Sequence, residues 1–217
     1  MFVYAIVAVK GLSTSKKRLS PVLSPQGRRQ LTQAMLKDVL TALKASTVNE
    51  TVIISTDSTL CDLASKFNAA SLVQKSRGLN LAIDEATDWC MRKGAEAALI
   101  LPADLPMLSF TDVDRIIELG NCTEQIVLLS PSYDGGTNVL FQSPPNLIHA
   151  CFGPRSFSKH FKQACRRAVR VKFYYSLGVA MDIDSPEDLR KLLKMQGTPA
   201  CRRVMDLFGL DVNAPVC

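Results

Sequence analysis

Residues 2–44, FVYAIVAVKGLSTSKKRLSPVLSPQGRRQLTQAMLKDVLTALK, contain the pattern that decides the fold. The first part, residues 2–9, is continuously apolar, which is typical of a strand buried on both faces of a sheet. After a polar loop, Ser24 and Pro25 have the arrangement of a helix start, with serine as N-cap and proline in the first helical position. Apolar side chains then recur every four residues, which predicts an amphipathic helix over residues 25–44.

The rest of the chain repeats this alternation. Apolar or β-branched runs predict further strands at residues 51–56, 71–74, 97–101, 126–130, 137–142 and 169–175. Amphipathic or capped segments predict further helices at residues 58–67, 79–90, 109–119, 156–167, 185–195 and 199–208. Repeated strand–helix units indicate an α/β fold, in which a mostly parallel sheet carries helices on both faces. No linker is long enough to divide the chain, so we expect one domain over residues 1–217.

The composition is that of an ordinary globular protein. Of the 217 residues, 47% are hydrophobic and 21% are charged, which excludes disorder as the main state. The longest apolar runs are too short to span a bilayer, and the first follows Met1 with no basic leader, so we expect no membrane partner. The seven cysteines form no C-x-x-C pair, a usage that favours the reducing cytoplasm.

The net charge of +6 favours an anionic partner. Charge alone does not distinguish nucleic acid from a phosphorylated small molecule, but the chain lacks interleaved aromatic and basic residues and any nucleic-acid motif, so we expect no nucleic acid. Open α/β sheets bind ligands at the carboxyl ends of their strands, near a switch in strand order. The segments that follow the predicted strands are therefore the candidate sites.

The loop after the first strand, residues 10–19, combines glycine, hydroxyls and cations. Lys10, Lys16 and Arg18 suit the oxygens of a phosphate, lysine as a point charge and arginine as a two-pronged donor. The loop matches neither the P-loop nor the G-x-G-x-x-G pattern. These residues alone do not distinguish a phosphate-binding site from a solvated basic loop.

Carboxylates follow two other segments. Asp104 ends a very apolar strand, and Asp182 and Asp184 lie on the same side of their segment if it is extended. Magnesium is usually held by one or two carboxylates plus substrate phosphates, so these residues are candidate ligands. The alternative is that Asp104 caps a turn and Asp184 belongs to the start of the next helix.

Three segments contain glycine beside polar groups. The turn at residues 135–138, Gly-Gly-Thr-Asn, allows a ligand close to backbone N–H groups, although a plain hairpin turn is the alternative. Gly153 precedes a helix start at Ser156, which suits an anion; the alternative is an ordinary serine N-cap. Gly78 also precedes a helix, and the amide of Asn80 suits a purine edge, against the alternative of a polar first-turn residue.

The only histidines are His149 and His160, and neither has the spacing of a metal ligand. We interpret both as surface or satisfied helix residues. The sequence also has no Ser-His-Asp order and no nucleophile elbow, so nothing predicts covalent catalysis.

Taken in order, these segments resemble the 2-phospho-L-lactate guanylyltransferase family. Each motif alone is weak, but the ordered set is specific and covers nearly the whole chain up to about residue 197. The motifs are VAVK at 7–10, SKKRLSPVLS at 15–24, GLN at 78–80, ADLP at 103–106, GGTN at 135–138, FG-x-x-SF at 152–157 and DIDSPEDL at 182–189.

The resemblance implies an activity and a fold. Members of the family make an activated guanylyl intermediate for coenzyme F(420) from GTP and a small phosphorylated acid, with magnesium. The implied fold is the nucleotide-diphospho-sugar transferase (GT-A-like) type, a Rossmann-like mixed sheet. The resemblance also implies a homodimer.

The resemblance also assigns roles to individual residues. By this resemblance, Gly136, Thr137, Gly153 and Ser156 would hold the phosphate and carboxylate of the acid. Those that hold magnesium are Asp104 and Asp184, together with Asp182. Those that face the triphosphate are Lys10, Lys16 and Arg18, which with Asp104 form the catalytic group. Those near the base are Gly78 and Asn80.

Other functions stay open on the residues themselves. A molybdenum-cofactor or sugar nucleotidyltransferase shares the fold and the metal chemistry, but such proteins usually have a Gly-rich first loop. A non-catalytic GTP-binding module explains the charge but not the aspartates at two strand ends. The sequence does not choose among 2-phospho-L-lactate, phosphoenolpyruvate and 3-phosphoglycerate as the acid.

Overall fold

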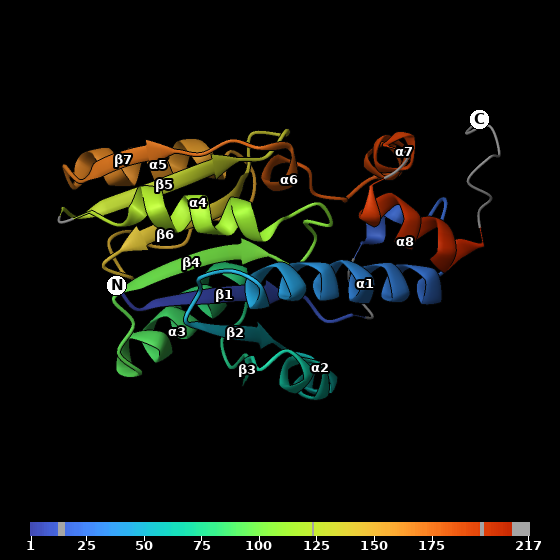
Figure 1. Ribbon diagram of the computed structural model, residues 1–217, viewed down its shortest axis with the longest axis horizontal. Coiled ribbons are helices and arrows are strands. Elements are labelled where there is room, and N and C mark those ends of the chain that lie inside the picture. The colour runs from blue at the N-terminus through green and yellow to red at the C-terminus, as the bar shows by residue number, and fades with distance from the viewer. Residues whose placement is uncertain (13–15, 123, 196–197, 210–217) are drawn as a thin grey trace.

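The computed structural model describes residues 1–12, 16–122, 124–195 and 198–209 (Figure 1). Seven strands form one sheet in the order β3-β2-β1-β4-β6-β5-β7. All neighbouring pairs are parallel except those of β6, which runs antiparallel to β4 and β5. The strands are β1 (Val3–Val9), β2 (Glu50–Ser55), β3 (Ala70–Val73), β4 (Ala97–Pro102), β5 (Ile126–Pro131), β6 (Thr137–Ser143) and β7 (Arg170–Phe173).

Helices cover both faces of the sheet, as expected (Figure 1). Residues of α1, α2, α4 and α6 pack on one face, and residues of α3 and α5 pack on the other. The helices are α1 (Pro25–Lys44), α2 (Cys61–Lys66), α3 (Leu79–Arg92), α4 (Phe110–Gly120), α5 (Ser156–Arg166), α6 (Leu177–Ala180), α7 (Pro186–Lys194) and α8 (Pro199–Phe208), with the 3-10 turns η1 (Lys17–Leu19) and η2 (Ser58–Leu60).

Strand β1 shows why continuous apolar sequence forms a central strand. Val7 and its alternate neighbours contact the α1 face, while Tyr4 and Ile6 contact the α3 face. Because successive side chains point to opposite faces, a strand covered on both sides needs an apolar residue at every position.

A third apolar cluster lies beyond the end of the sheet. Leu19 and Leu31 pack there against Ile183, Leu192 and residues of α8. In Figure 1 this cluster corresponds to the blue and red helices at the right, next to the carboxyl ends of β1 and β4. It forms a wall beside the edge where ligands of α/β proteins bind.

Local signals predicted most element positions to within a residue or two. Ser24 caps α1 as expected, since its side chain accepts a hydrogen bond from Gly27 N at 3.1 Å. The segment expected to form one helix over residues 58–67 divides into η2 and α2, and the short helix α6 was not expected.

The strand order switches between β1 and β4. From β1 the chain moves outward through β2 and β3, and then crosses to the other side of β1 as β4. A crevice opens at such a switch point, outside the carboxyl ends of the strands. In the described part of the chain, no helix is long and apolar enough to cross a membrane.

Candidate functional site

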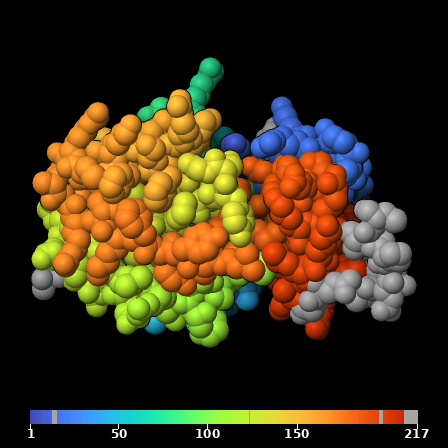
Figure 2. Space-filling view, turned by 90° about the horizontal axis from the view of Figure 1, so that it is seen from above, coloured from blue at the N-terminus to red at the C-terminus, as the bar shows by residue number. Residues whose placement is uncertain are grey.

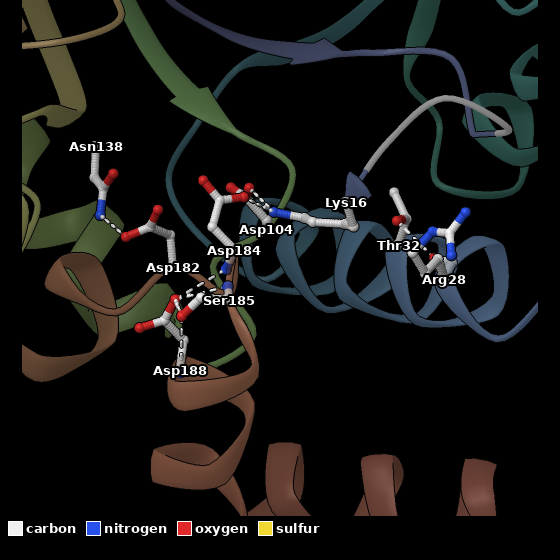
Figure 3. Close-up of polar contacts among 9 residues, drawn as sticks. All are labelled: Lys16, Arg28, Thr32, Asp104, Asn138, Asp182, Asp184, Ser185 and Asp188. Carbon is white, nitrogen blue, oxygen red and sulfur yellow. Dashed lines mark hydrogen bonds and ion pairs between the residues drawn. The ribbon is translucent and has the colours of Figure 1, made fainter. Parts of the chain in front are cut away.

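Three aspartates meet at the switch point (Figure 3). Asp104 follows β4, while Asp182 and Asp184 lie between α6 and α7. A main-chain hydrogen bond from Ile183 N to Asp104 O, 3.3 Å long, joins the two segments. Met181 and Ile183 pack in the apolar cluster beyond the sheet. Asp182 and Asp184 alternate with them along the chain, so their side chains point the other way, into the crevice. One carboxylate oxygen from each aspartate lies within 4.8 Å of the others.

Lys16 brings a positive charge to this cluster. Its ammonium pairs with Asp104 and, at 2.7 Å, with Asp184 Oδ1. Figure 3 shows the side chain reaching across to both carboxylates. Burial by itself lowers the pKa of Lys16, but the two carboxylates outweigh it and the pKa lies above its usual value. One ammonium beside three carboxylates leaves a formal charge of −2, which matches one divalent cation.

Burial also acts on the carboxyl group of Asp182. Burial and the charges of Asp104 and Asp184 raise its pKa to about 6. The amide of Asn138 donates to Asp182 Oδ1 at 3.4 Å and also holds Val179 O at 2.9 Å. Asn138 therefore fixes the turn that presents Asp182.

Asp184 is positioned by the helix that follows it. Ser185 and Asp188 form a reciprocal capping box at the start of α7. Asp184 N also donates to Asp188 Oδ2 at 3.3 Å. The cap therefore uses only the main chain of Asp184, and its carboxylate can face the cluster.

One atom of the cluster is unpaired. Among the described residues, Asp104 Oδ1 is buried and has no hydrogen-bond partner. A buried acceptor without a partner costs about 1–3 kcal/mol, which a bound cation would recover. Carboxylate oxygens are also the ligands that hard divalent cations prefer.

Two adjoining cavities lie at the carboxyl end of β1. One, of about 180 Å³, is lined by Lys10, Lys16, Asp104 and Asp184. The other, of about 220 Å³, shares Lys10 and extends to Gly78. Figure 2 shows a hollow between the yellow and orange residues and the blue and red residues. The exposed Lys10 therefore lies between the two cavities.

At the start of α3, the side chain of Asn80 bonds to the main chain of another segment, a contact that the sequence did not predict. Gly78 has a φ of +97°, a conformation that favours glycine. The Asn80 side chain accepts a hydrogen bond from Phe152 N at 2.7 Å and donates one to Phe152 O at 3.2 Å. Asn80 thus holds the segment before Gly153, and its role in reading a base stays a prediction.

The start of α5 contains a second unpaired group. Gly153 has a φ of +115°, and its carbonyl accepts from Ser156 N at 3.0 Å. The N-cap is Arg155, so the alternative of a serine N-cap is wrong. Ser156 Oγ is buried and has no partner among the described residues. A buried hydroxyl at a helix start is suited to an anionic ligand.

The glycine turn and the basic loop are neighbours. Gly135 has a φ of +81°, and a Cβ atom on Gly136 would lie 2.6 Å from Ser132 Oγ, so a side chain there would clash. Hydrogen bonding from Ser132 lowers the pKa of Asp134 in this turn, and the charge of Arg18 adds to the effect. The positive charge of the exposed Arg18 is therefore close enough to this turn to act on Asp134.

The structure shows the partners of His160, which the sequence interpretation treated as a surface or satisfied helix residue and which is buried with both ring nitrogens hydrogen-bonded. Thr137 Oγ1 is 2.9 Å from His160 Nδ1, and both side chains are buried. His160 is four residues after Ser156, so the two lie on the same face of α5. This spacing was the available sequence signal, but only the fold shows that Thr137 faces it.

Comparison with known proteins gives the family. A family model described as "Guanylyl transferase CofC like" matches residues 3–214. The chain belongs to this family. It is therefore a nucleotidyltransferase, and the resemblance found in the sequence is confirmed.

Relatives in this guanylyl transferase family have two different names. A phosphoenolpyruvate guanylyltransferase of Rubrobacter xylanophilus is 40% identical over 192 residues, covering 88% of this chain and 94% of the relative. A 2-phospho-L-lactate guanylyltransferase of Methanocaldococcus vulcanius is 36% identical over 189 residues, covering 86% of this chain and 82% of the relative.

Solved structures confirm the fold class. A protein of Desulfovibrio desulfuricans, classed as a nucleotide-diphospho-sugar transferase, superposes with a TM-score of 0.78 at 16% identity, covering 98% of this chain and 100% of the other. A cytidylyltransferase of Leptospira borgpetersenii has a TM-score of 0.58 at 16% identity, covering 97% and 93%. The guanylyl transferase therefore has the expected Rossmann-like mixed sheet.

Proposed function

We propose that this protein transfers the guanylyl group of GTP to a small acid that carries a phosphate and a carboxylate, releasing pyrophosphate, in coenzyme F(420) biosynthesis. Family membership supports guanylyl transfer. The names of the relatives support 2-phospho-L-lactate or phosphoenolpyruvate as the acid. The observation that carries the proposal is the cluster of three aspartates with Lys16 at the switch point.

Magnesium fits this cluster. Asp104, Asp182 and Asp184 would hold the ion, because their oxygens converge, Asp104 Oδ1 is unpaired, and the net charge of −2 matches it. When bound, magnesium would neutralise charge on the phosphates of the nucleotide.

Cations and two cavities are available for GTP. Lys10 and Lys16 line the cavity beside the aspartates, where they would face the triphosphate. The second cavity, which reaches Gly78, would take the base. Arg18, whose charge acts on the glycine turn, would add a third cation for the phosphates.

The acid would lie against the turn at Gly136 and the start of α5. Thr137 and Ser156 provide hydroxyls, and the positive end of the α5 dipole, just after Gly153, favours an anion. An oxygen of the acid's phosphate attacks the α-phosphorus and forms the new P–O bond. The bond from that phosphorus to the bridging oxygen breaks, and pyrophosphate leaves with the electron pair. A phosphate dianion needs no general base, so the residues act through positioning and charge.

The test is pyrophosphate release from GTP with each of three acids: 2-phospho-L-lactate, phosphoenolpyruvate and 3-phosphoglycerate. We expect release with at least one acid, its loss when magnesium is chelated, and its loss in Asp184→Asn. The matched control is Asp88→Asn, which changes an exposed aspartate of α3 outside the site. No release with any acid would refute the proposed function, and equal loss in the control would refute the assignment of the cluster.

We also propose a reducing compartment, the cytoplasm, because Cys61, Cys90, Cys122, Cys151, Cys165 and Cys201 are free thiols. The expected homodimer stays a prediction, which the mass in solution tests directly.

A further inference from the structure

The segment that leads to the start of α5 is held by side chains from two helices. Three consecutive main-chain N–H groups, of residues 150–152, donate to Asp84 Oδ1, His160 Nε2 and Asn80 Oδ1 respectively. Asp84 and Asn80 belong to α3, and His160 belongs to α5. The segment is therefore fixed from both sides, and His160 is part of the support.

The bond to Cys151 determines which ring nitrogen of His160 carries the proton. A main-chain N–H can only donate, so His160 Nε2, 2.8 Å from Cys151 N, accepts with its lone pair. The neutral ring then has its hydrogen on Nδ1. Burial and the charge of Lys159 lower the pKa of His160 to about 4, so the ring is neutral near pH 7.

The protonated Nδ1 in turn determines the role of Thr137. Since Nδ1–H is a donor, Thr137 Oγ1 at 2.9 Å accepts, and its own hydrogen is not used by the ring. His160 is the one hydrogen-bond partner of this hydroxyl among the described residues. The hydroxyl is thus held as a donor. The buried Ser156 Oγ, which has no partner among the described residues, lies one helical turn before His160 on α5.

We propose that His160 is a positioning residue for the acid substrate: its Nδ1–H holds Thr137 so that the threonine hydroxyl donates to the acid. This inference rests on the proposed function, which places Thr137 at the site of the acid. His160 itself touches no reacting atom. Its ring packs edge-on against Phe152 at 4.9 Å between ring centres, which keeps the plane of the imidazole in place.

Kinetics with matched variants test the proposal. Thr137→Val removes the hydroxyl and should raise the KM for the acid roughly 10- to 100-fold, the range for a hydrogen bond to a charged group, while the KM for GTP stays constant. His160→Phe keeps a ring against Phe152 but removes both ring nitrogens, and should raise the acid KM about 10-fold. His160→Asn, which retains an N–H near the position of Nδ1, should stay closer to the wild type than His160→Phe.

A double variant separates positioning from a structural role. In Thr137→Val combined with His160→Phe, the acid KM should equal that of Thr137→Val if the ring acts on the acid through the threonine hydroxyl and not through its bond to Cys151 N. The proposal would be overturned if the effects of the two substitutions on the acid KM multiplied in the double variant. It would also be overturned if His160→Phe raised the KM for GTP as much as the KM for the acid. Failure of the wild type to use any acid would instead refute the proposed function.

A spectroscopic measurement tests the tautomer independently of activity. The chain has only two histidines, so His149→Gln leaves His160 as the sole imidazole signal. Nitrogen-15 NMR of this variant near pH 7 should show a protonated Nδ1 and an unprotonated Nε2. The opposite tautomer would overturn the proposal, whatever the kinetics show.

Discussion

The neutral state of His160 has a measurable effect on acid stability. Burial and Lys159 lower its pKa from 6.5 to about 4 in the folded protein. Between these values the unfolded chain binds more protons than the folded one, so the free energy of unfolding rises with pH. At about 1.4 kcal/mol per pKa unit, the difference is worth about 3 kcal/mol, present above pH 6.5 and lost on acidification to pH 4.

Urea unfolding of the wild type and His160→Phe from pH 4 to pH 7.5 measures this contribution. Subtracting one free energy from the other removes the titration of the groups that both proteins share. The wild type should lose about 3 kcal/mol relative to the variant as pH falls, since phenylalanine does not titrate. A flat difference for His160→Phe would refute a buried neutral imidazole.

Three further predictions concern single side chains. Asp104→Asn and Asp184→Asn each remove charge from the proposed magnesium site, so turnover should fall by orders of magnitude while circular dichroism stays unchanged; wild-type rates in both would contradict the site. Ser156→Ala should raise the KM for the acid more than that for GTP, by an amount equivalent to about 0.5–1.5 kcal/mol. Asp38 of α1 pairs with Arg203 of α8 at 2.7 Å, yet burial outweighs this pair and raises the pKa of Asp38 to about 6. Asp38→Asn should therefore stabilise the protein by at most about 3 kcal/mol at pH 8, a gain that disappears towards pH 4 in thermal unfolding.

Much of the fold could be predicted because its signals are local. Helix α1 begins after Ser24, whose cap spans three residues, and Ser185 caps α7 in the same way. The apolar run of β1 predicted a strand covered on both faces. Hydrogen bonds between residues three or four apart, and side-chain alternation, depend on nearby sequence, so composition and spacing suffice to predict them.

Part of the candidate site followed from the same local rules. Alternation placed Asp182 and Asp184 on one side of their segment, and Asp104 was expected at a strand end. Their meeting required tertiary contacts: Ile183 N bonds to Asp104 O, and Asn138 of β6, the strand beside β4, bonds to Asp182. The ion pairs of Lys16 with Asp104 and Asp184 join residues 88 and 168 positions apart, a separation that no local pattern encodes.

The hydrogen-bond partners of Asn80 and His160 were decided by the tertiary structure. The amide of Asn80 bonds to the main chain of Phe152, a contact that the sequence did not predict, and its expected role in reading a base stays a prediction. His160 was interpreted as a surface or satisfied helix residue, and its ring nitrogens are both hydrogen-bonded, but its tautomer depends on one N–H, that of Cys151. A side chain with both donors and acceptors has no definite role until the fold brings particular atoms within about 3 Å of it. The sequence therefore determined which chemistry was present, and the packing determined which atoms perform it.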